Sequence, residues 1–271
     1  MPAPLDLLKS ALPEGIPVPV RWLHGLGISS AAIHAQVKGK WLNPLAGRAY
    51  ARPGPALTWQ SYLFSAQQTG SVIHVGNLSA LALHGLAHYL ALGGQEQVHL
   101  YHPARLPKWL QTLPADVHWH HEQIVQEQSP IHRVASSLRE PKLDIPAAQL
   151  LGVEKQYAAT PQIFISSPER AALEVAADLT RGGSWDSAYE VFTGLTNLRP
   201  TLVQKLLEAC RSKVTRRIFL HLAHTSGHAW LKALDETQLD LGTGDRQVVS
   251  GGQLDQQYRI TVPARWQDDA F

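Results

Sequence analysis

Two groups of histidines have the spacing that metal ions use in proteins. His84 and His88 lie four residues apart in an apolar stretch, so a helix would place both imidazoles on one face. The second group, with steps of three and four residues, consists of His221, His224 and His228. A hydrolytic zinc helix needs a glutamate after its first histidine, where this chain has Gly85, and neither group has an acidic or cysteine ligand at a useful spacing. We therefore interpret these histidines as structural and predict no metal site.

The glycine-rich turns near the C-terminus do not fit a phosphate-binding loop. Gly242 and Gly244, and then Gly251 and Gly252, lie between strand-like runs, whereas a phosphate loop ends in Gly-Lys-Ser/Thr and leads into a helix. These glycines are typical of hairpin turns. The sequence also lacks the Gly-x-Ser-x-Gly elbow of many hydrolases. We expect no catalytic residue, no cofactor and no enzymatic activity.

A helix-turn-helix pattern occupies residues 26–42. Gly27 suits a tight turn between two helices, and Ser29 can cap the second helix with its hydroxyl. Ile33 and Val37, four apart, share the buried face of that helix. The opposite face has no bulky apolar side chain and would suit a DNA major groove.

A basic β-hairpin is predicted directly after this helix, which Gly39 ends. Residues 40–42 and 48–51 flank a turn at 43–47, so helices and hairpin together predict a winged helix-turn-helix. The side chains predicted to contact DNA are Ser29, Ser30, His34, Lys38, Lys40 and Arg48. Residues 1–60 contain six basic and two acidic side chains, while the rest of the chain contains 18 basic and 20 acidic ones. This asymmetry favours a module that faces phosphates.

A second basic cluster consists of Arg211, Lys213, Arg216 and Arg217. Two interpretations are equally open. The cluster is either a solvated helix end with cations near the C-terminal dipole, or a patch for an acidic partner or nucleic acid.

Composition and periodicity predict a chain of α+β class, with the winged helix followed by a mixed α/β region. The expected domains are residues 1–55 and 56–271, with a further subdivision open near 130–165, and a linking helix is expected over 59–69. Strands are expected at 71–75, 97–101, 117–120 and 123–125, and again at 238–241, 246–249 and 258–263. Helices are expected at 78–92, at 168–179 and around residues 188–195, 202–210 and 217–223. The single cysteine, Cys210, and the lack of a long apolar run or signal sequence indicate a cytoplasmic protein with no membrane partner.

The order of several short motifs resembles that of the AbiEi antitoxins of type IV toxin-antitoxin systems. The motifs are residues 27–42, 75–85, 166–174, 198–200, 216–220, 240–246 and 258–263. The resemblance implies a winged helix that represses its own operon by binding inverted repeats in double-stranded DNA. It also implies a C-terminal domain that antagonises a nucleotidyltransferase toxin encoded beside it, without need of a stable complex between the two.

The predicted recognition face departs from a strong base reader. It offers Ser30, His34 and Lys38, but no Arg, Asn or Gln for bidentate base contacts. Affinity would then depend on phosphate contacts, fall steeply with salt and require two molecules on adjacent half-sites. Two alternatives remain: an antitoxin that binds its toxin directly and uses the winged helix only for docking, and a nuclease or metal-dependent transferase built on residues 71–263.

Overall fold

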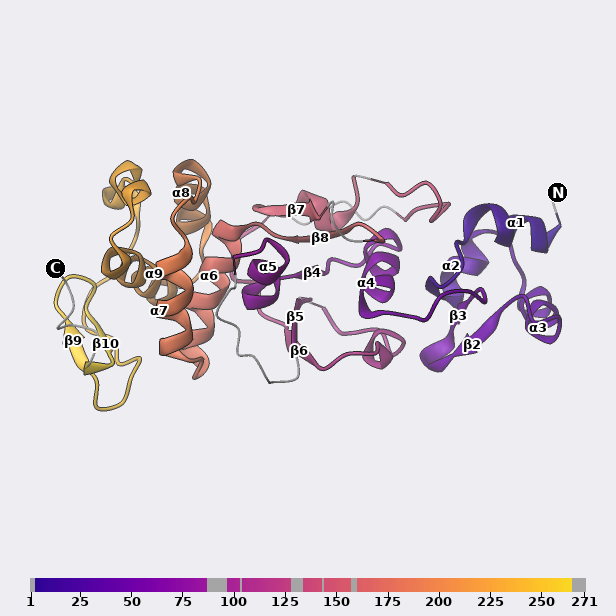
Figure 1. Cartoon of the computed structure of the whole chain (residues 1–271), viewed down its shortest axis with the longest axis horizontal. Coiled ribbons are helices and arrows are strands. Elements are labelled where there is room, and N and C mark those ends of the chain that lie inside the picture. Colours follow the sequence, from indigo (N-terminus) through magenta and orange to yellow (C-terminus); the bar gives the residue numbers. More distant parts are fainter. Residues whose placement is uncertain are drawn as a thin grey trace. The chain divides into compact units, whose positions relative to one another are not determined.

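The computed structural model describes residues 3–86, 97–102, 104–127, 134–142, 144–156 and 160–264. It has the mixed α+β class that the sequence predicts (Figure 1). The chain forms two compact units. Unit 1 comprises residues 1–74, 96–122 and 129–165, and unit 2 comprises residues 75–95, 123–128 and 166–271. Within the described residues, no helix combines the length and the apolar composition needed to span a membrane. The domain boundary expected near residue 55 stays a prediction.

Unit 1 begins with three helices and three strands. Helix α1 (Pro4–Ala11), strand β1 (Pro17–Pro19), and helices α2 (Val20–Gly25) and α3 (Ser30–Lys38) precede a hairpin of β2 (Asn43–Leu45) and β3 (Ala49–Ala51). The three strands form an antiparallel sheet in the order β1-β3-β2. The buried Leu8, Leu12, Leu23 and Ile33 supply apolar side chains from all three helices. Helices and sheet therefore bury one side of α3 and leave the other to solvent.

The hairpin begins later than the sequence predicts, because residues 40 and 41 close the preceding helix. Lys40 adopts a left-handed φ of 59°. The amides of Lys40 and Trp41 donate to the carbonyls of Val37 and Gln36 at 3.0 and 2.9 Å. Strand β2 consequently occupies residues that were predicted as the turn. The turn itself is a 3₁₀ segment, η1 (Ala46–Arg48), which also contains a left-handed residue, Gly47, at φ 69°.

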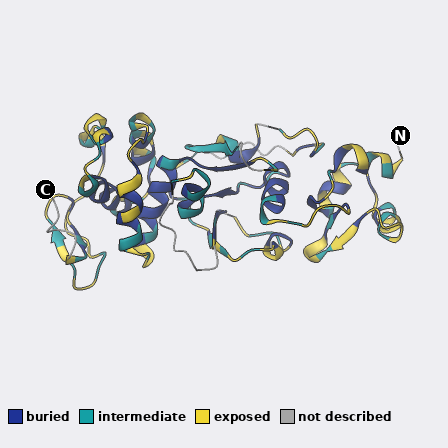
Figure 2. Ribbon diagram, viewed as in Figure 1, coloured by how far each residue is buried: buried dark blue, intermediate teal, exposed yellow. Residues whose placement is uncertain are grey.

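Helix α4 (Trp59–Gln68), predicted as a linker, instead belongs to the buried interior of unit 1. Thr58 and Ser61 form a reciprocal capping box at its start. Residues 61–68 are all buried, as Figure 2 shows in dark blue. The amide of the Gln67 side chain donates to the carbonyls of Ile73 and Phe164, both at 2.9 Å. A linker would not bury a polar side chain that is hydrogen-bonded to two other segments, so the expectation is corrected.

A five-stranded sheet follows α4. Its strands are β4 (His74–Val75), β5 (Val98–Tyr101), β6 (Val117–His120), β7 (Val153–Gln156) and β8 (Ile163–Ser166), in the order β6-β5-β4-β8-β7. The strand expected at 71–75 is shortened to two residues. The one expected at 123–125 contributes only an isolated bridge between Val125 and Cys210. Strands β5 and β6 are parallel, so two residues that are paired in register, such as His99 and His118, lie on the same face of the sheet.

Unit 2 is mainly helical. It contains α5 (Asn77–Leu83), α6 (Pro168–Asp178), α7 (Trp185–Gly194), α8 (Pro200–Ala209) and α9 (Lys213–Ser226), and the antiparallel strands β9 (Gln253–Asp255) and β10 (Ile260–Val262). Helix α5 ends at Leu83, short of the predicted 78–92, and residues 87–96 lie outside the described part of the chain. The strands expected at 238–241 and 246–249 do not form. Residues 236–238 are a 3₁₀ turn, and Arg246 makes one isolated bridge to Ile260.

Helix α6 lies at the centre of unit 2, packed against α5, α8 and α9. Ser167 caps it, and the side chains from Glu169 to Ala177 are all buried. Its charges are paired internally: Arg170 is 3.0 Å from the Glu174 carboxylate and 2.6 Å from that of Glu127. Burial alone would lower the pKa of Arg170, but these two carboxylates raise it. The ion pairs therefore allow a charged helix to occupy a core position.

Candidate nucleic-acid interface

The start of α3 is fixed by the two residues that the sequence singled out. Gly27 has a left-handed φ of 82°, which a tight turn before the helix requires. The Ser29 hydroxyl accepts a hydrogen bond from the Ala32 amide at 3.2 Å, so it caps the helix as predicted. Ile28 and Ile33 are each 1% exposed and anchor the turn and the helix in the core. The turn before α3 and the buried side chains on either side of its first residue therefore fix the direction of the helix.

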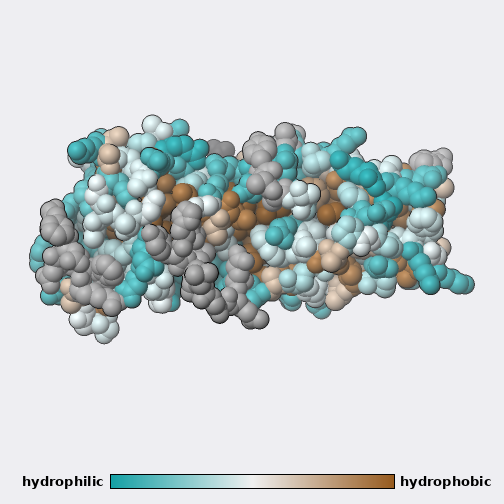
Figure 3. Space-filling model, viewed as in Figure 1, coloured by the Kyte–Doolittle hydropathy of each residue, from teal (hydrophilic) through white to brown (hydrophobic). Residues whose placement is uncertain are grey.

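The face of α3 opposite this core is open to solvent. Ser30, His34 and Lys38 recur every four residues and therefore follow one stripe of the helix, and all three are exposed. The Ser30 hydroxyl lies 3.3 Å from Nε2 of His24 on the preceding helix. The other residues predicted to contact DNA, Ser29, Lys40 and Arg48, are also exposed. In the view of Figure 3, hydrophilic residues cover much of the surface over the N-terminal helices.

The turn of the hairpin between β2 and β3, predicted as the wing, packs closely against the backbone of Trp109. A Cβ atom on Gly47 would come within 2.4 Å of the backbone nitrogen of Trp109, so only glycine allows this close approach. The Trp109 ring in turn stacks on Tyr62 of α4, with ring centroids 5.9 Å apart. Arg48, the next residue, stays exposed and has a left-handed φ of 61°. The hairpin therefore exposes Arg48 next to a turn that is fixed by its packing against Trp109.

Two cations of the N-terminal region have roles that the sequence did not reveal. Arg52 is buried and donates to the Leu12 carbonyl at 2.9 Å and to the Glu14 carboxylate at 3.0 Å, so its charge is used inside the unit. Lys9 lies 4.6 Å above the ring of Trp41, an exposed tryptophan directly before the hairpin. These partners are far apart in sequence, so no local pattern could have indicated either contact.

Neither interpretation holds for the two central arginines of the second basic cluster, which are buried near the N-terminal end of α9. Arg216 and Arg217 are 9% and 3% exposed. The Arg216 guanidinium donates to the carbonyls of Leu207, Glu208, Cys210 and Asp240, and that of Arg217 to the carbonyls of Leu241, Gly244 and Arg259. Lys213 is exposed but pairs with the Asp240 carboxylate at 2.6 Å. Of these four residues, Arg211 alone has an exposed side chain with no ion pair to another described residue. The arginines instead hold the glycine-containing loop at 241–244 against α9.

Four of the five histidines with metal-like spacing are described, and each of these is hydrogen-bonded within the protein. His84 Nε2 lies 2.9 Å from the Ser166 carbonyl, while His88 lies outside the described residues. His224 contacts the Glu236 carboxylate at 2.7 Å, and His228 contacts the Phe192 carbonyl at 2.5 Å. His221 lies between the Asp255 carboxylate, at 2.5 Å, and the Tyr189 hydroxyl. Burial raises the pKa of Asp255, but hydrogen bonds, led by that of His221, outweigh it and lower the pKa overall.

Two family models match the chain almost from end to end. One, described as the N-terminal domain of the AbiEi antitoxin transcriptional regulator, matches residues 2–92. The other, described as the AbiEi antitoxin transcriptional regulator of type IV toxin-antitoxin systems, matches residues 95–263. The chain belongs to the AbiEi antitoxin family. This assignment confirms the resemblance inferred from the order of the short motifs.

Among solved structures, this AbiEi-family chain is similar to the crystal structure of the RV2827C protein from Mycobacterium tuberculosis. The two share 15% sequence identity, and the TM-score is 0.49. The match covers 90% of this chain and 85% of the other. No curated protein matches the sequence.

Proposed function

We propose that this AbiEi-family chain is a transcriptional autorepressor and antitoxin that acts in the cytoplasm and binds inverted repeats in its own promoter. One observation carries the proposal: the outer stripe of α3 and the adjoining hairpin expose Ser29, Ser30, His34, Lys38, Lys40 and Arg48. A helix of nine residues, capped at its start and bare of bulky apolar side chains outside, suits the major groove.

The chemistry of this surface favours phosphate contacts over base reading. Lys38 and Lys40 are close in sequence at the end of α3, and Arg48 extends from the anchored wing. If Lys38, Lys40 and Arg48 each contact one phosphate, the slope of the logarithm of the binding constant against the logarithm of the salt concentration should be about −2.7 for one bound molecule and about −5.4 for two. Two protomers on an inverted repeat would place one α3 in each of two major grooves about one helical turn apart.

A salt series tests the repressor proposal. Binding of the full-length protein to its upstream DNA is measured by gel shift at several salt concentrations. Lys38→Ala and Arg48→Ala should each weaken binding uniformly across sequences and reduce the magnitude of the slope by about 0.9 per protomer. Lys205→Ala is the matched control, because this lysine is exposed on α8 in the other unit. It should leave both affinity and slope unchanged.

The outcome separates two functions. Absent or salt-insensitive DNA binding, or an equal loss from Lys205→Ala, rejects the repressor and leaves the winged helix as a docking surface for the toxin. A steep slope that is lost with Lys38 and Arg48 supports the repressor.

We further propose that the chain antagonises a nucleotidyltransferase toxin and has no catalysis of its own. The family assignment supports the antitoxin role, since both matching models describe an AbiEi antitoxin transcriptional regulator. Co-expression with the neighbouring gene measures the effect on growth. If Lys38→Ala still rescues growth, the antitoxin activity does not depend on DNA binding. If this variant no longer rescues growth, repression of the operon is the source of the protection.

A further inference from the structure

A cavity of about 590 Å³ lies within unit 1, beside the helix that precedes α3. Its walls come from α2, from the C-terminal end of α4 and from residues 134–136. Two hydrogen bonds fix these segments to one another. The Trp22 indole donates to the Ala135 carbonyl at 2.7 Å, and the Ala135 amide donates to the Gln68 carbonyl at 2.8 Å. The cavity is therefore formed before any ligand binds, as small-molecule sites usually are.

The size and the apolar wall of this cavity suit a small molecule. Pockets of about 300–1,000 Å³ hold ligands of that size. Trp22, Leu26, Val134 and Ala135 line the wall with apolar side chains. Because the indole nitrogen of Trp22 already donates to Ala135, the rest of that ring offers only apolar surface. Val134 leaves 53% of its surface exposed, so an occupant would remove apolar surface from water.

One cation accompanies this apolar wall. Among the described residues that line the cavity, Arg21 is the only charged one, and its side chain is exposed. The hydroxyl groups of Thr69 and Ser136 belong to the other two segments. A guanidinium without a carboxylate among its described neighbours in the lining favours an anionic group, and its planar fork suits a carboxylate.

We propose that this cavity binds a small amphipathic organic anion. Its apolar body would lie against Trp22, Leu26 and Val134, and its anionic group would lie at Arg21. None of the six residues proposed to contact DNA lines the cavity, so this site is additional to the surface of α3 and the hairpin.

Dye titration of the full-length, folded protein tests the site. Anilinonaphthalene sulfonate joins an apolar aromatic body to one anionic group, and phenylnaphthylamine has the same rings without the charge. We expect one saturable equivalent of the sulfonate, measured by its fluorescence. Arg21→Met should weaken sulfonate binding about fivefold, the upper range for an exposed ion pair, and should change binding of the neutral dye less than about twofold.

A second variant fills the cavity. Gly25 ends α2 and lines the cavity, and a Cβ atom there would meet no other atom within 4 Å. Gly25→Leu should therefore fold normally and weaken both dyes by about tenfold or more, because its side chain takes up the space of the ligand. Gly194→Leu is the matched control. Gly194 ends α7 in unit 2, and a Cβ there would meet only the Leu86 carbonyl oxygen, at 4.0 Å, so both affinities should stay unchanged.

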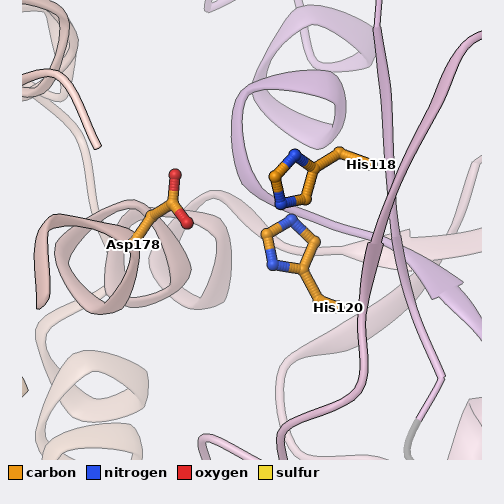
Figure 4. A group of neighbouring side chains, drawn as sticks. All are labelled: His118, His120 and Asp178. Carbon is orange, nitrogen blue, oxygen red and sulfur yellow. The ribbon is translucent and has the colours of Figure 1, made fainter. Parts of the chain in front are cut away.

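Another control concerns the rings on β6. Figure 4 shows His118 next to His120, and their ring centroids are 4.5 Å apart. Since His118 is exposed, this cluster is a second place in unit 1 where an aromatic dye could stack. His118→Ala should leave the affinity for both dyes unchanged if the cavity is the binding site.

Several results would overturn the proposal. It is wrong if the folded protein binds no saturable equivalent, if Gly25→Leu keeps the wild-type affinity, or if either control loses as much affinity as Gly25→Leu. Equal weakening of the two dyes by Arg21→Met would reject an anionic ligand. An affinity that falls as the protein concentration rises would assign the cavity to a second copy of the chain instead. Circular dichroism of each variant separates loss of the site from loss of the fold, and Arg21→Met, at an exposed position, decides the case if Gly25→Leu does not fold.

Discussion

Replacing Arg216 with methionine should destabilise the protein far more than the same replacement at Arg211. Arg216 is buried and donates to four carbonyls, whereas Arg211 is exposed. The bonds to Leu207 and Cys210 are buried, and each carbonyl left without a partner costs about 1–3 kcal/mol. The carbonyls of Glu208 and Asp240 are partly exposed and can turn to water. The expected loss in the free energy of unfolding is about 4 kcal/mol for Arg216→Met and under about 0.5 kcal/mol for Arg211→Met.

Urea unfolding at neutral pH measures the two free energies, and hydrogen exchange of the α9 amides shows whether the loss is centred on that helix. Methionine keeps most of the apolar volume of arginine, so the comparison isolates the guanidinium. Equal stability of the two variants would refute the assignment of Arg216 to the interior. Weaker nucleic-acid binding by Arg216→Met, with unchanged stability, would instead restore the patch interpretation.

Three further predictions concern pH, capping and the wing. Burial raises the pKa of Glu169, but its bonds to Arg199 outweigh burial and lower it, so this pair stabilises the fold above about pH 4.5 and the stabilisation is lost on acidification. Arg199→Met should lower stability at neutral pH and flatten its decline on acidification in urea titrations across about pH 3–7. Ser29→Ala should cost about 1 kcal/mol of unfolding free energy, which Ser29→Asn should largely restore; no loss would mean that the cap is unimportant. Gly47→Ala should cost more than about 2 kcal/mol, because of its φ of 69° and a backbone nitrogen 2.4 Å from the new Cβ. Gly244→Ala, with a similar φ and open space, should cost only about 1 kcal/mol, and equal losses would contradict the steric argument.

The features that the sequence predicted well are those with a local cause. The caps Ser29 and Ser167, the turn at Gly27 and the first helical position of Pro168 act within four residues, so their residue types alone indicate where a helix begins. The exposed stripe of α3 followed from helical periodicity, and it includes every side chain predicted there.

The features that it missed depend on partners distant in the chain. Arg52 is held by Leu12 and Glu14, and Arg217 by carbonyls 24–42 residues away, so a count of charges could not show that these cations are internal. The short strands near the C-terminus pair across turns that no alternating pattern marks. The histidines of β5 and β6 become neighbours only through strand register, which sequence spacing does not contain.

Unit 2 includes residues 75–95, which lie in sequence between two segments of unit 1, and this limits where the chain can be cut into fragments. Helix α5 precedes β5 and β6 in sequence, yet it belongs to unit 2, where the Asn77 amide binds the buried Glu174 carboxylate and His84 binds the Ser166 carbonyl. A fragment that begins at residue 166 would lose both contacts, and a fragment that ends at 165 would carry α5 without its partner. Repression and toxin antagonism are therefore better separated by point substitutions or by circular permutation than by deleting either half.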